Sequence, residues 1–416
     1  MPFWYYRDER VAGRSRELRS SCRRTPSDAA AASVRSPTTL RTKVQLALDS
    51  FVKKPNYHLS HNVGIPGMPF VRRPGVPLQR VLGNDIGGAI YTPLVPQGRT
   101  VLHLWNKIKL GGRGPWGVTY ESRLPRLPDG QLRLAKLRRT LDGDESLRFV
   151  NAISIYARDR LIRELTTEDH KHLIEKIQVV YPRVIGSDDG LFLPTSDRLP
   201  LQFVFVGNAF FRKGGEAVLR FVEQRGDEFD VNVTIVSTLA HSDYATPWVT
   251  RQYRDEIASR LAAHPRVSWL PGASHNRVLR LMQESHVALL PSLADTFGYS
   301  LAEGAVSGAM AVGSNVQALP EILGTIGRRI ELDVDEVNEW VGARGPKSAY
   351  DEAIALLSNG IVKVAVEARE NPSDFDRDRL ALLALARAKF GSVRDLALSD
   401  IYLKAGLLPR DWTATQ

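Results

Sequence analysis

The chain has 416 residues, which is enough for two or three domains. Apolar residues make up 43% and charged residues 25%, an ordinary globular composition that excludes a fibrous or mostly disordered protein. The net charge of +10 favours an anionic partner, either nucleic acid or a membrane surface. The single cysteine, Cys22, excludes an intrachain disulfide framework and a multi-cysteine metal site, and it fits a reducing cytoplasm.

The positive charge is confined to the first half of the chain. It amounts to +6 over residues 1–43 and +8 over 44–195, whereas residues 196–416 carry −4. Residues 1–43 lack the apolar core of a signal peptide, and we interpret them as a basic, disordered tail. An organelle transit peptide is the alternative, against which the acids among these residues argue. No apolar run reaches the roughly 18 residues that span a bilayer.

The N-terminal half alternates strand and helix patterns after a loop-rich start. We expect a short helix over 43–53, followed by Gly- and Pro-rich loops with short strands over 55–98. Apolar runs then predict strands at Val101–Trp105, Trp116–Tyr120, Ala152–Ile155 and Ile177–Tyr181, with helices at Tyr156–Leu165 and Thr167–Lys176. This alternation predicts a parallel α/β sheet.

The second half repeats the alternation more clearly, beyond a linker near 187–199. Strands are expected at Leu201–Val206, Val231–Ser237, Val267–Leu270, Val287–Leu290 and Met310–Gly313. Helices are expected at Glu216–Gln224, Val249–His264, Arg277–Ser285, Leu301–Ser307, Glu321–Leu323, Ala349–Ser358, Arg377–Phe390 and Val393–Ala405. The pattern predicts a doubly wound α/β domain followed by helices. We place the domains at 44–195 and 196–375, with C-terminal helices over 376–416.

The first chemical motif follows the strand Leu201–Val206. A turn that begins at Gly207 and ends at Gly214-Gly215 leads into a helix, with Lys213 just before it. Such a turn exposes backbone N–H groups at the positive end of the helix dipole, which favours a phosphate. An ordinary strand–loop–helix connection with a solvated lysine is the alternative, and spacing alone does not separate the two.

The second motif follows the strand Val287–Leu290. Asp295 stands in the loop after the strand, and Glu303 lies eight residues further on, in the first turns of a helix. Loops at the carboxyl ends of parallel strands form α/β ligand sites, and carboxylates there accept hydrogen bonds from sugar or ribose hydroxyls. The alternative is that Asp295 caps the helix and Glu303 lies on a solvated face.

At these residues the chain resembles the group 1 (GT4-like) retaining glycosyltransferases, which have the GT-B fold of two Rossmann-like doubly wound domains facing across a cleft. The resemblance is specific over about 196–325 and 385–403 and weaker over 101–185. It includes Pro320-Glu321-Ile322, and it is carried chiefly by the segments VFVGNAFFRKGG and VALLPSLADTFGYSLAEGAVSGAMAVGSN.

The resemblance implies that the C-terminal domain binds a nucleotide-sugar donor and that the N-terminal domain binds the acceptor. By position, Lys213 contacts the donor diphosphate, Glu303 holds the ribose hydroxyls, and Asp295 sits beside the transferred sugar as a catalytic residue. The remaining donor-binding candidates are Gly207, Asn208, Gly214, Phe297, Gly298 and Tyr299. Neither a metal nor another cofactor is expected, because cations and a helix N-terminus neutralise the leaving diphosphate.

Three features depart from the family pattern. Asn208 stands where the family usually has an arginine on the diphosphate, and Asp295 stands where glutamate is usual. Arg212 could replace the missing cation, or it could point to solvent. The glycine-rich opening loop of the family is not evident: Gly87-Gly88 and Gly111-Gly112 are candidates for it, but each is more typical of a plain turn.

Three features of the N-terminal half could serve an acceptor. His103 ends a strand and is a candidate catalytic or acceptor-side group, although a histidine in a buried strand is more often structural. Glu121 follows the next strand and has the same two interpretations. The basic segment Leu132–Leu141 suits either an anionic membrane surface or a surface helix packed on its sheet.

The sequence therefore predicts a cytoplasmic enzyme that can associate peripherally with a membrane. Its reaction would be sugar transfer, with retention, to a saccharide or lipid-linked acceptor in polysaccharide or glycolipid biosynthesis. A non-catalytic GT-B homologue that acts as a binding or scaffold subunit is the alternative. Nucleic-acid binding is disfavoured, because no recognition motif accompanies the basic charge.

Overall fold

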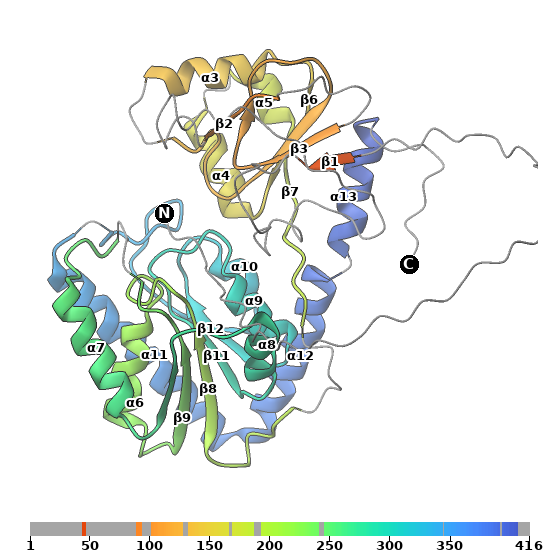
Figure 1. Ribbon diagram of the computed structural model, residues 1–416. Coiled ribbons are helices and arrows are strands. Elements are labelled where there is room, and N and C mark those ends of the chain that lie inside the picture. The colour runs from red at the N-terminus through yellow and green to blue at the C-terminus, as the bar shows by residue number, and fades with distance from the viewer. Residues whose placement is uncertain are drawn as a thin grey trace, which may run out of the picture.

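The computed structural model describes residues 44–46, 89–93, 101–127, 132–165, 169–186, 193–240, 245–343, 345–391 and 393–406. These residues form two α/β domains, one above the other in Figure 1. The predicted tail over 1–43 and the Gly87-Gly88 turn lie outside the described residues.

The N-terminal domain is built on a five-stranded parallel sheet with the order β1-β3-β5-β6-β7. Its core consists of apolar side chains from the central strands and the helices packed on them, such as Val118, Val150 and Leu161. A separate pair of short parallel strands, β2 and β4, lies beside it. The strands are β1 (Val44–Leu46), β2 (Ile90–Tyr91), β3 (Val101–Trp105), β4 (Ile108–Lys109), β5 (Trp116–Tyr120), β6 (Leu147–Ala152) and β7 (Ile177–Val179). The helices are α3 (Leu132–Asp142), α4 (Ile155–Glu164) and α5 (Lys171–Glu175).

Two predictions for this domain are corrected. The helix expected over 43–53 begins as a strand, because Val44–Leu46 pairs in parallel with β3 at the sheet edge, and long-range pairing outweighs a short helical pattern. The strand expected at Ala152–Ile155 instead spans Leu147–Ala152. It ends at Ala152 because Ser154 caps α4 through a hydrogen bond from the Ala157 N–H.

The C-terminal domain has a six-stranded parallel sheet with the order β10-β9-β8-β11-β12-β13. The chain winds outward from β8 to β10, then returns to the other side of β8 and winds outward again from β11. Figure 1 shows α6, α7 and α11 on one face of this sheet and α8, α9 and α12 on the other. The strands are β8 (Leu201–Val206), β9 (Val231–Val236), β10 (Val267–Leu270), β11 (Val287–Leu290), β12 (Met310–Ser314) and β13 (Arg328–Ile330). The helices between them are α6 (Gly215–Arg225), α7 (Arg251–Ala263), α8 (His275–Gln283), α9 (Tyr299–Val306) and α10 (Leu319–Leu323).

Three long helices end the described chain: α11 (Lys347–Glu370), α12 (Pro372–Phe390) and α13 (Val393–Lys404). The first two pack on the C-terminal domain, whereas α13 lies beside the upper domain in Figure 1. Side-chain bonds hold it there: among them, the Tyr402 hydroxyl bonds to His103, and Arg183 pairs with Asp395. The C-terminal helices thus contact both domains (Figure 1).

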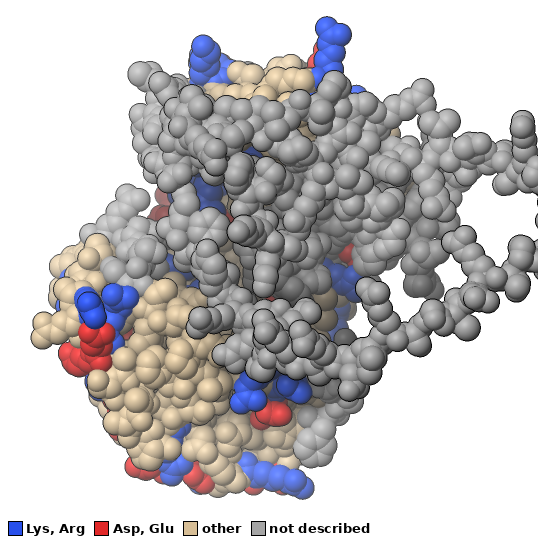
Figure 2. All heavy atoms as spheres, viewed as in Figure 1, with Lys and Arg blue, Asp and Glu red and all other residues tan. Residues whose placement is uncertain are grey.

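The described surface carries mixed charge. Figure 2 shows Lys and Arg side chains standing among uncharged residues, with acidic side chains close to several of them, on the described part of this face. Within the described residues, no helix is both long and apolar enough to traverse a bilayer.

Candidate active site

The candidate site lies where the winding of the C-terminal sheet reverses. Strands β8 and β11 are neighbours in the sheet although three helices and two strands separate them in the chain. At such a point the helices that follow the two strands lie on opposite faces of the sheet (Figure 1), which leaves room for a ligand at the carboxyl edge. The loop over 207–214 follows β8, and the loop over 291–298 follows β11.

The two loops are packed together as one unit. Gly214 has a positive φ of 75°, and a Cβ added to it would lie 1.9 Å from the Pro291 carbonyl oxygen. The Leu293 N–H donates to the Arg212 carbonyl at 2.8 Å, and the Arg212 guanidinium donates to the Ala294 carbonyl. Arg212 therefore faces the second loop rather than solvent, and it ties the two predicted motifs together.

An ion pair joins the two motifs at their centre. The Lys213 Nζ lies 2.8 Å from Asp295 Oδ2, and both side chains are about 11% exposed. The lysine stem runs across Gly207, where an added Cβ would lie 2.6 Å from Lys213 Cδ. Residues 82 positions apart in the chain thus form an ion pair, and Lys213 is a buried cation rather than a solvated one.

Asp295 also shapes the start of α9. Its Oδ1 accepts the Gly298 N–H at 2.7 Å, so the capping interpretation and the site interpretation both apply to this residue. Burial raises the pKa of Asp295, but the charges of Lys213 and Arg212 together with the hydrogen bonds outweigh burial and hold it below its usual value. The carboxylate is therefore ionised at neutral pH.

Helix α9 points its positive end at this ion pair. Gly298 adopts a left-handed conformation at the N-cap, with φ 86°, and has no side chain of its own with which to cap the helix. The Phe297 ring is buried between Tyr181 and Phe390, so only its backbone faces the site. In the part of the chain that the structure describes, the buried Ser300 Oγ has no hydrogen-bond partner. This end of the helix can accept an anion.

Glu303 is buried one turn further along α9. Burial raises its pKa to about 8, against the opposing charge of Lys213. The His275 Nε2, at the start of α8, lies 3.6 Å from Glu303 Oε1. The interpretation of Glu303 as a residue on a solvated face is therefore wrong. Burying a carboxylate without a close cation destabilises a fold, and buried, perturbed carboxylates are typical of functional sites.

Asn208 is engaged by the loop after β9. Its Oδ1 accepts hydrogen bonds from the Thr238 N–H at 3.3 Å and from the Thr238 hydroxyl at 3.2 Å. Asn208 adds no charge, so Lys213 and Arg212 are the cations of these two loops. The centre of the Tyr299 ring lies 4.8 Å from the centre of the Phe297 ring.

His103 stands apart from these residues. It is fully buried, its Nδ1 is 2.6 Å from the Tyr402 hydroxyl, and its Nε2 is 2.8 Å from the Thr119 hydroxyl. Both ring nitrogens are used in packing α13 against β3 and β5, and this environment contradicts the catalytic role expected for His103. We therefore leave it out of the proposed machinery.

The other N-terminal candidates also have protein partners. Glu121 pairs with Arg126 at 3.1 Å. In the basic segment, which forms α3, Arg138 is buried against Glu164 and Arg139 pairs with Asp169. Gly111-Gly112 forms a turn after β4 with positive φ at both residues. Among the described residues there is no cluster of three or more His, Cys, Asp or Glu side chains that could hold a metal ion.

Sequence reasoning did not single out His275 and Thr238, which stand after strands β10 and β9. Both follow the carboxyl ends of strands in the predicted sheet, and that position was the available signal.

The sequence is similar to known glycosyltransferases. Residues 200–358 match the profile of a family described as glycosyl transferases group 1. An MMP α-(1→4)-mannosyltransferase from Mycolicibacterium hassiacum is 27% identical over 163 residues, which are 38% of this chain and 38% of the relative. The match thus spans well under half of that relative's length.

Two solved structures share the fold over most of the chain. Sucrose-phosphate synthase from Thermosynechococcus elongatus has a TM-score of 0.50 at 14% identity, covering 87% of this chain and 88% of the other. Anabaena HepE, solved in complex with UDP, has a TM-score of 0.51 at 13% identity, covering 80% and 85%. Together with the two parallel sheets, their covering helices and the C-terminal helices of this chain, these neighbours confirm the predicted GT-B fold.

Proposed function

We propose that this chain, whose residues 200–358 form a group 1 glycosyltransferase domain, transfers a sugar from a nucleotide-diphosphate sugar to an acceptor with retention of anomeric configuration. The observation that carries the proposal is the buried Lys213–Asp295 pair beside the open N-terminus of α9, with Glu303 one turn away. A cation, the positive end of a helix and a carboxylate match the diphosphate, its negative charge and the ribose hydroxyls of such a donor.

In the proposed reaction the bond between the anomeric carbon and the diphosphate oxygen breaks. The acceptor hydroxyl oxygen bonds to the same face of that carbon, and its proton passes to the departing diphosphate. Lys213 and the N–H groups of α9 stabilise the charge that develops on the leaving oxygen, which is the largest contribution expected in a site without a general base. Asp295 orients Lys213 and lies beside the transferred sugar.

We propose a saccharide or lipid-linked acceptor bound by the N-terminal domain. The net charge of that half, +14 over residues 1–195, favours an acidic glycan or an anionic lipid surface. Helix α3 supports membrane binding weakly, because Arg138 and Arg139 are paired within the protein. Co-sedimentation with vesicles, with and without anionic lipid, tests this part of the proposal separately.

The donor proposal is tested by calorimetric titration with UDP, GDP and ADP, followed by a screen of nucleotide-sugars for diphosphate release. UDP and mannosyl donors come first, because HepE binds UDP and the M. hassiacum relative is a mannosyltransferase. The anomeric configuration of the product, read by NMR, tests retention.

Lys213→Ala is the decisive variant. Losing a charge-assisted bond to the diphosphate weakens nucleotide binding about 10- to 100-fold. Lys363→Ala, at an exposed position of α11, is the matched control and leaves binding unchanged. Nucleotide binding that survives Lys213→Ala would remove the site assignment.

The alternative is a non-catalytic homologue that binds nucleotide. It is favoured by Asn208, which brings no cation, and by Asp295, which already neutralises Lys213. Turnover of a radiolabelled nucleotide-sugar separates the two, since a binding subunit retains nucleotide affinity without releasing diphosphate.

A further inference from the structure

Helix α4 of the N-terminal domain begins against the donor side of the C-terminal domain. The first N–H groups of any α-helix lack partners inside the helix. In α4 the Ala157 N–H is bonded to Ser154 Oγ, as in an ordinary N-cap. The two N–H groups before it bind Glu321, which is 165 or 166 residues away in the chain. Glu321 Oε2 accepts the Ile155 N–H at 2.8 Å, and Oε1 accepts the Tyr156 N–H at 2.9 Å.

Glu321 is held in place for this contact. It stands in the short helix α10, its Oε2 also accepts the Tyr181 hydroxyl at 3.0 Å, and its backbone carbonyl accepts Lys389 at 2.7 Å. The Lys389 amine lies 4.7 Å from the centre of the Tyr181 ring. A carboxylate at a helix N-terminus is favourable, and here helix and carboxylate belong to different domains.

A second bond from α4 reaches the donor loop itself. Besides capping the helix, the Ser154 Oγ donates to the Thr296 carbonyl at 3.0 Å. Thr296 is the residue after Asp295 and precedes the Phe297-Gly298 turn that opens α9. The start of α4 is therefore bonded to the peptide segment that sets the position of the Asp295 carboxylate.

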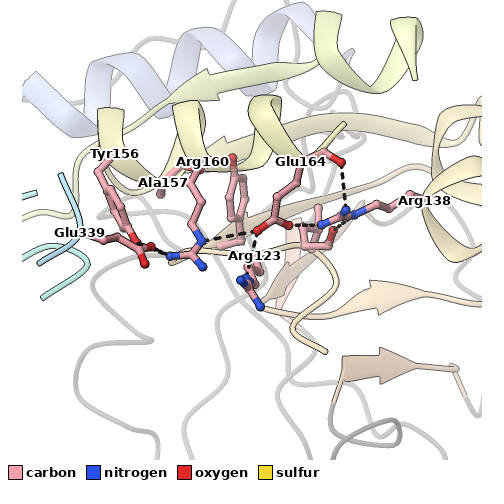
Figure 3. A network of polar contacts seen from close by, with 9 residues as sticks. Arg123, Arg138, Tyr156, Ala157, Arg160, Glu164 and Glu339 are labelled. Atoms are coloured by element: carbon pink, nitrogen blue, oxygen red, sulfur yellow. Dashed lines mark hydrogen bonds and ion pairs between the residues drawn. The ribbon is translucent and has the colours of Figure 1, made fainter. Parts of the chain in front are cut away.

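The contact continues along the helix, as Figure 3 shows. The Tyr156 hydroxyl donates to Glu339 at 2.8 Å, and Arg160 pairs with the same carboxylate. On the opposite side Arg160 also approaches Glu164, which binds Arg123 at 3.1 Å, in the loop after β5 at the carboxyl edge of the N-terminal sheet. A chain of polar contacts thus runs from the C-terminal domain to the expected acceptor side.

We propose that Ser154 and Glu321 are positioning residues that latch the acceptor-side domain onto the donor loop and thereby align the acceptor with the bound sugar. This inference rests on the proposed function. Neither residue is among those expected to contact the donor diphosphate. The latch therefore acts through the placement of α4 and of the Thr296 peptide. Its loss affects transfer to an acceptor far more than nucleotide binding.

The first test is structural and does not depend on activity. Spin labels are placed at two exposed positions, Lys136→Cys on α3 and Glu256→Cys on α7, in a Cys22→Ser background, and the distance between them is measured. Glu321→Ala broadens or shifts the distance distribution, and Glu321→Gln, which keeps the shape, does so less. Glu331→Gln, an exposed glutamate of the same domain, is the control and changes nothing. Identical distributions in all variants overturn the latch.

The second test is kinetic. Glu321→Gln lowers kcat for transfer to acceptor about tenfold, while the nucleotide Kd and the slow hydrolysis of the donor by water change less than about twofold. Ser154→Ala acts in the same direction, and Ser154→Thr, which keeps the hydroxyl, restores activity. A loss of thermal stability with unchanged kcat contradicts the positioning role. A wild-type protein that binds no nucleotide defeats the proposed function instead, and the distance measurement still decides on the latch.

Discussion

At the scale of single residues, the buried carboxyl of Glu303 lowers the stability of the fold when it is ionised, although its proposed role in binding requires that charge. It is buried with a pKa of about 8, against an ordinary value of 4.5. Because the folded state holds this proton more tightly than the unfolded state, the associated stability is complete below pH 4.5 and is lost as the pH rises through 8. A fold that keeps such a residue accepts a cost at neutral pH and above, which a binding role explains.

Glu303→Gln removes the charge and keeps the shape. We expect the free energy of unfolding at pH 9 to rise by on the order of 2 kcal/mol, with little change at pH 5, as measured by urea denaturation. Nucleotide affinity, measured by calorimetry, falls in the variant. In the wild type the affinity increases between pH 6 and pH 9 as Glu303 ionises, and in the variant it does not. Glu370→Gln, at an exposed position of α11, changes neither quantity. A variant that gains no stability at pH 9 would show that the carboxylate is not strained by burial.

The sequence predicted that Lys213, Asp295 and Glu303 lie at the same edge of the sheet, because all three follow the carboxyl ends of parallel strands. It did not identify the His275 contact with Glu303, nor the engagement of Asn208 by Thr238. These contacts depend on how loops from different strands lie against one another, and no local pattern records that. The catalytic role predicted for His103 was wrong for the same reason, since its partner Tyr402 is 299 residues away in the chain.

At the scale of elements, the two site loops act as a single packed unit. Gly214 is required twice, by its positive φ and by the closeness of the Pro291 carbonyl. Gly214→Ala therefore destabilises the protein by roughly 2–4 kcal/mol and weakens nucleotide binding, because the loops must separate to admit the methyl group. Urea denaturation and calorimetry measure the two effects. Gly272→Ala, where an added Cβ meets nothing within 4 Å, serves as the control. Equal behaviour of the two variants would refute the tight loop packing.

Most elements of the C-terminal domain could be predicted, because each has a clear apolar run between turns. Helix α11 was expected to stop at Ser358, where a Ser-Asn-Gly run is typical of a helix end. It continues to Glu370, because Ile361, Val364 and Ala368 extend the buried face of the helix and their packing outweighs the local signal. The N-terminal β1 shows the same priority of long-range contact over local pattern.

At the scale of the whole molecule, two sets of contacts among the described residues connect the domains. The first joins α4 to Glu321 and Thr296, and the second docks α13 on the N-terminal sheet through Tyr402 and His103. The second contact centres on His103, whose ring also packs edge-on against Phe149 at 4.9 Å. This arrangement makes α13 a structural strap of the N-terminal domain rather than part of the donor site.

Tyr402→Phe tests that assignment. The change leaves a fully buried histidine nitrogen without its bond, which costs about 1–3 kcal/mol of folding free energy. Hydrogen exchange should show faster opening of α13, whereas Tyr350→Phe, which breaks a buried hydroxyl bond to Glu216, should leave α13 protected. Below the unfolding transition, kcat and nucleotide affinity stay within about threefold of wild type, and His103→Gln behaves alike. A hundredfold loss of kcat in His103→Gln without loss of stability would instead return His103 to the catalytic machinery, because a purely structural histidine affects turnover only through folding.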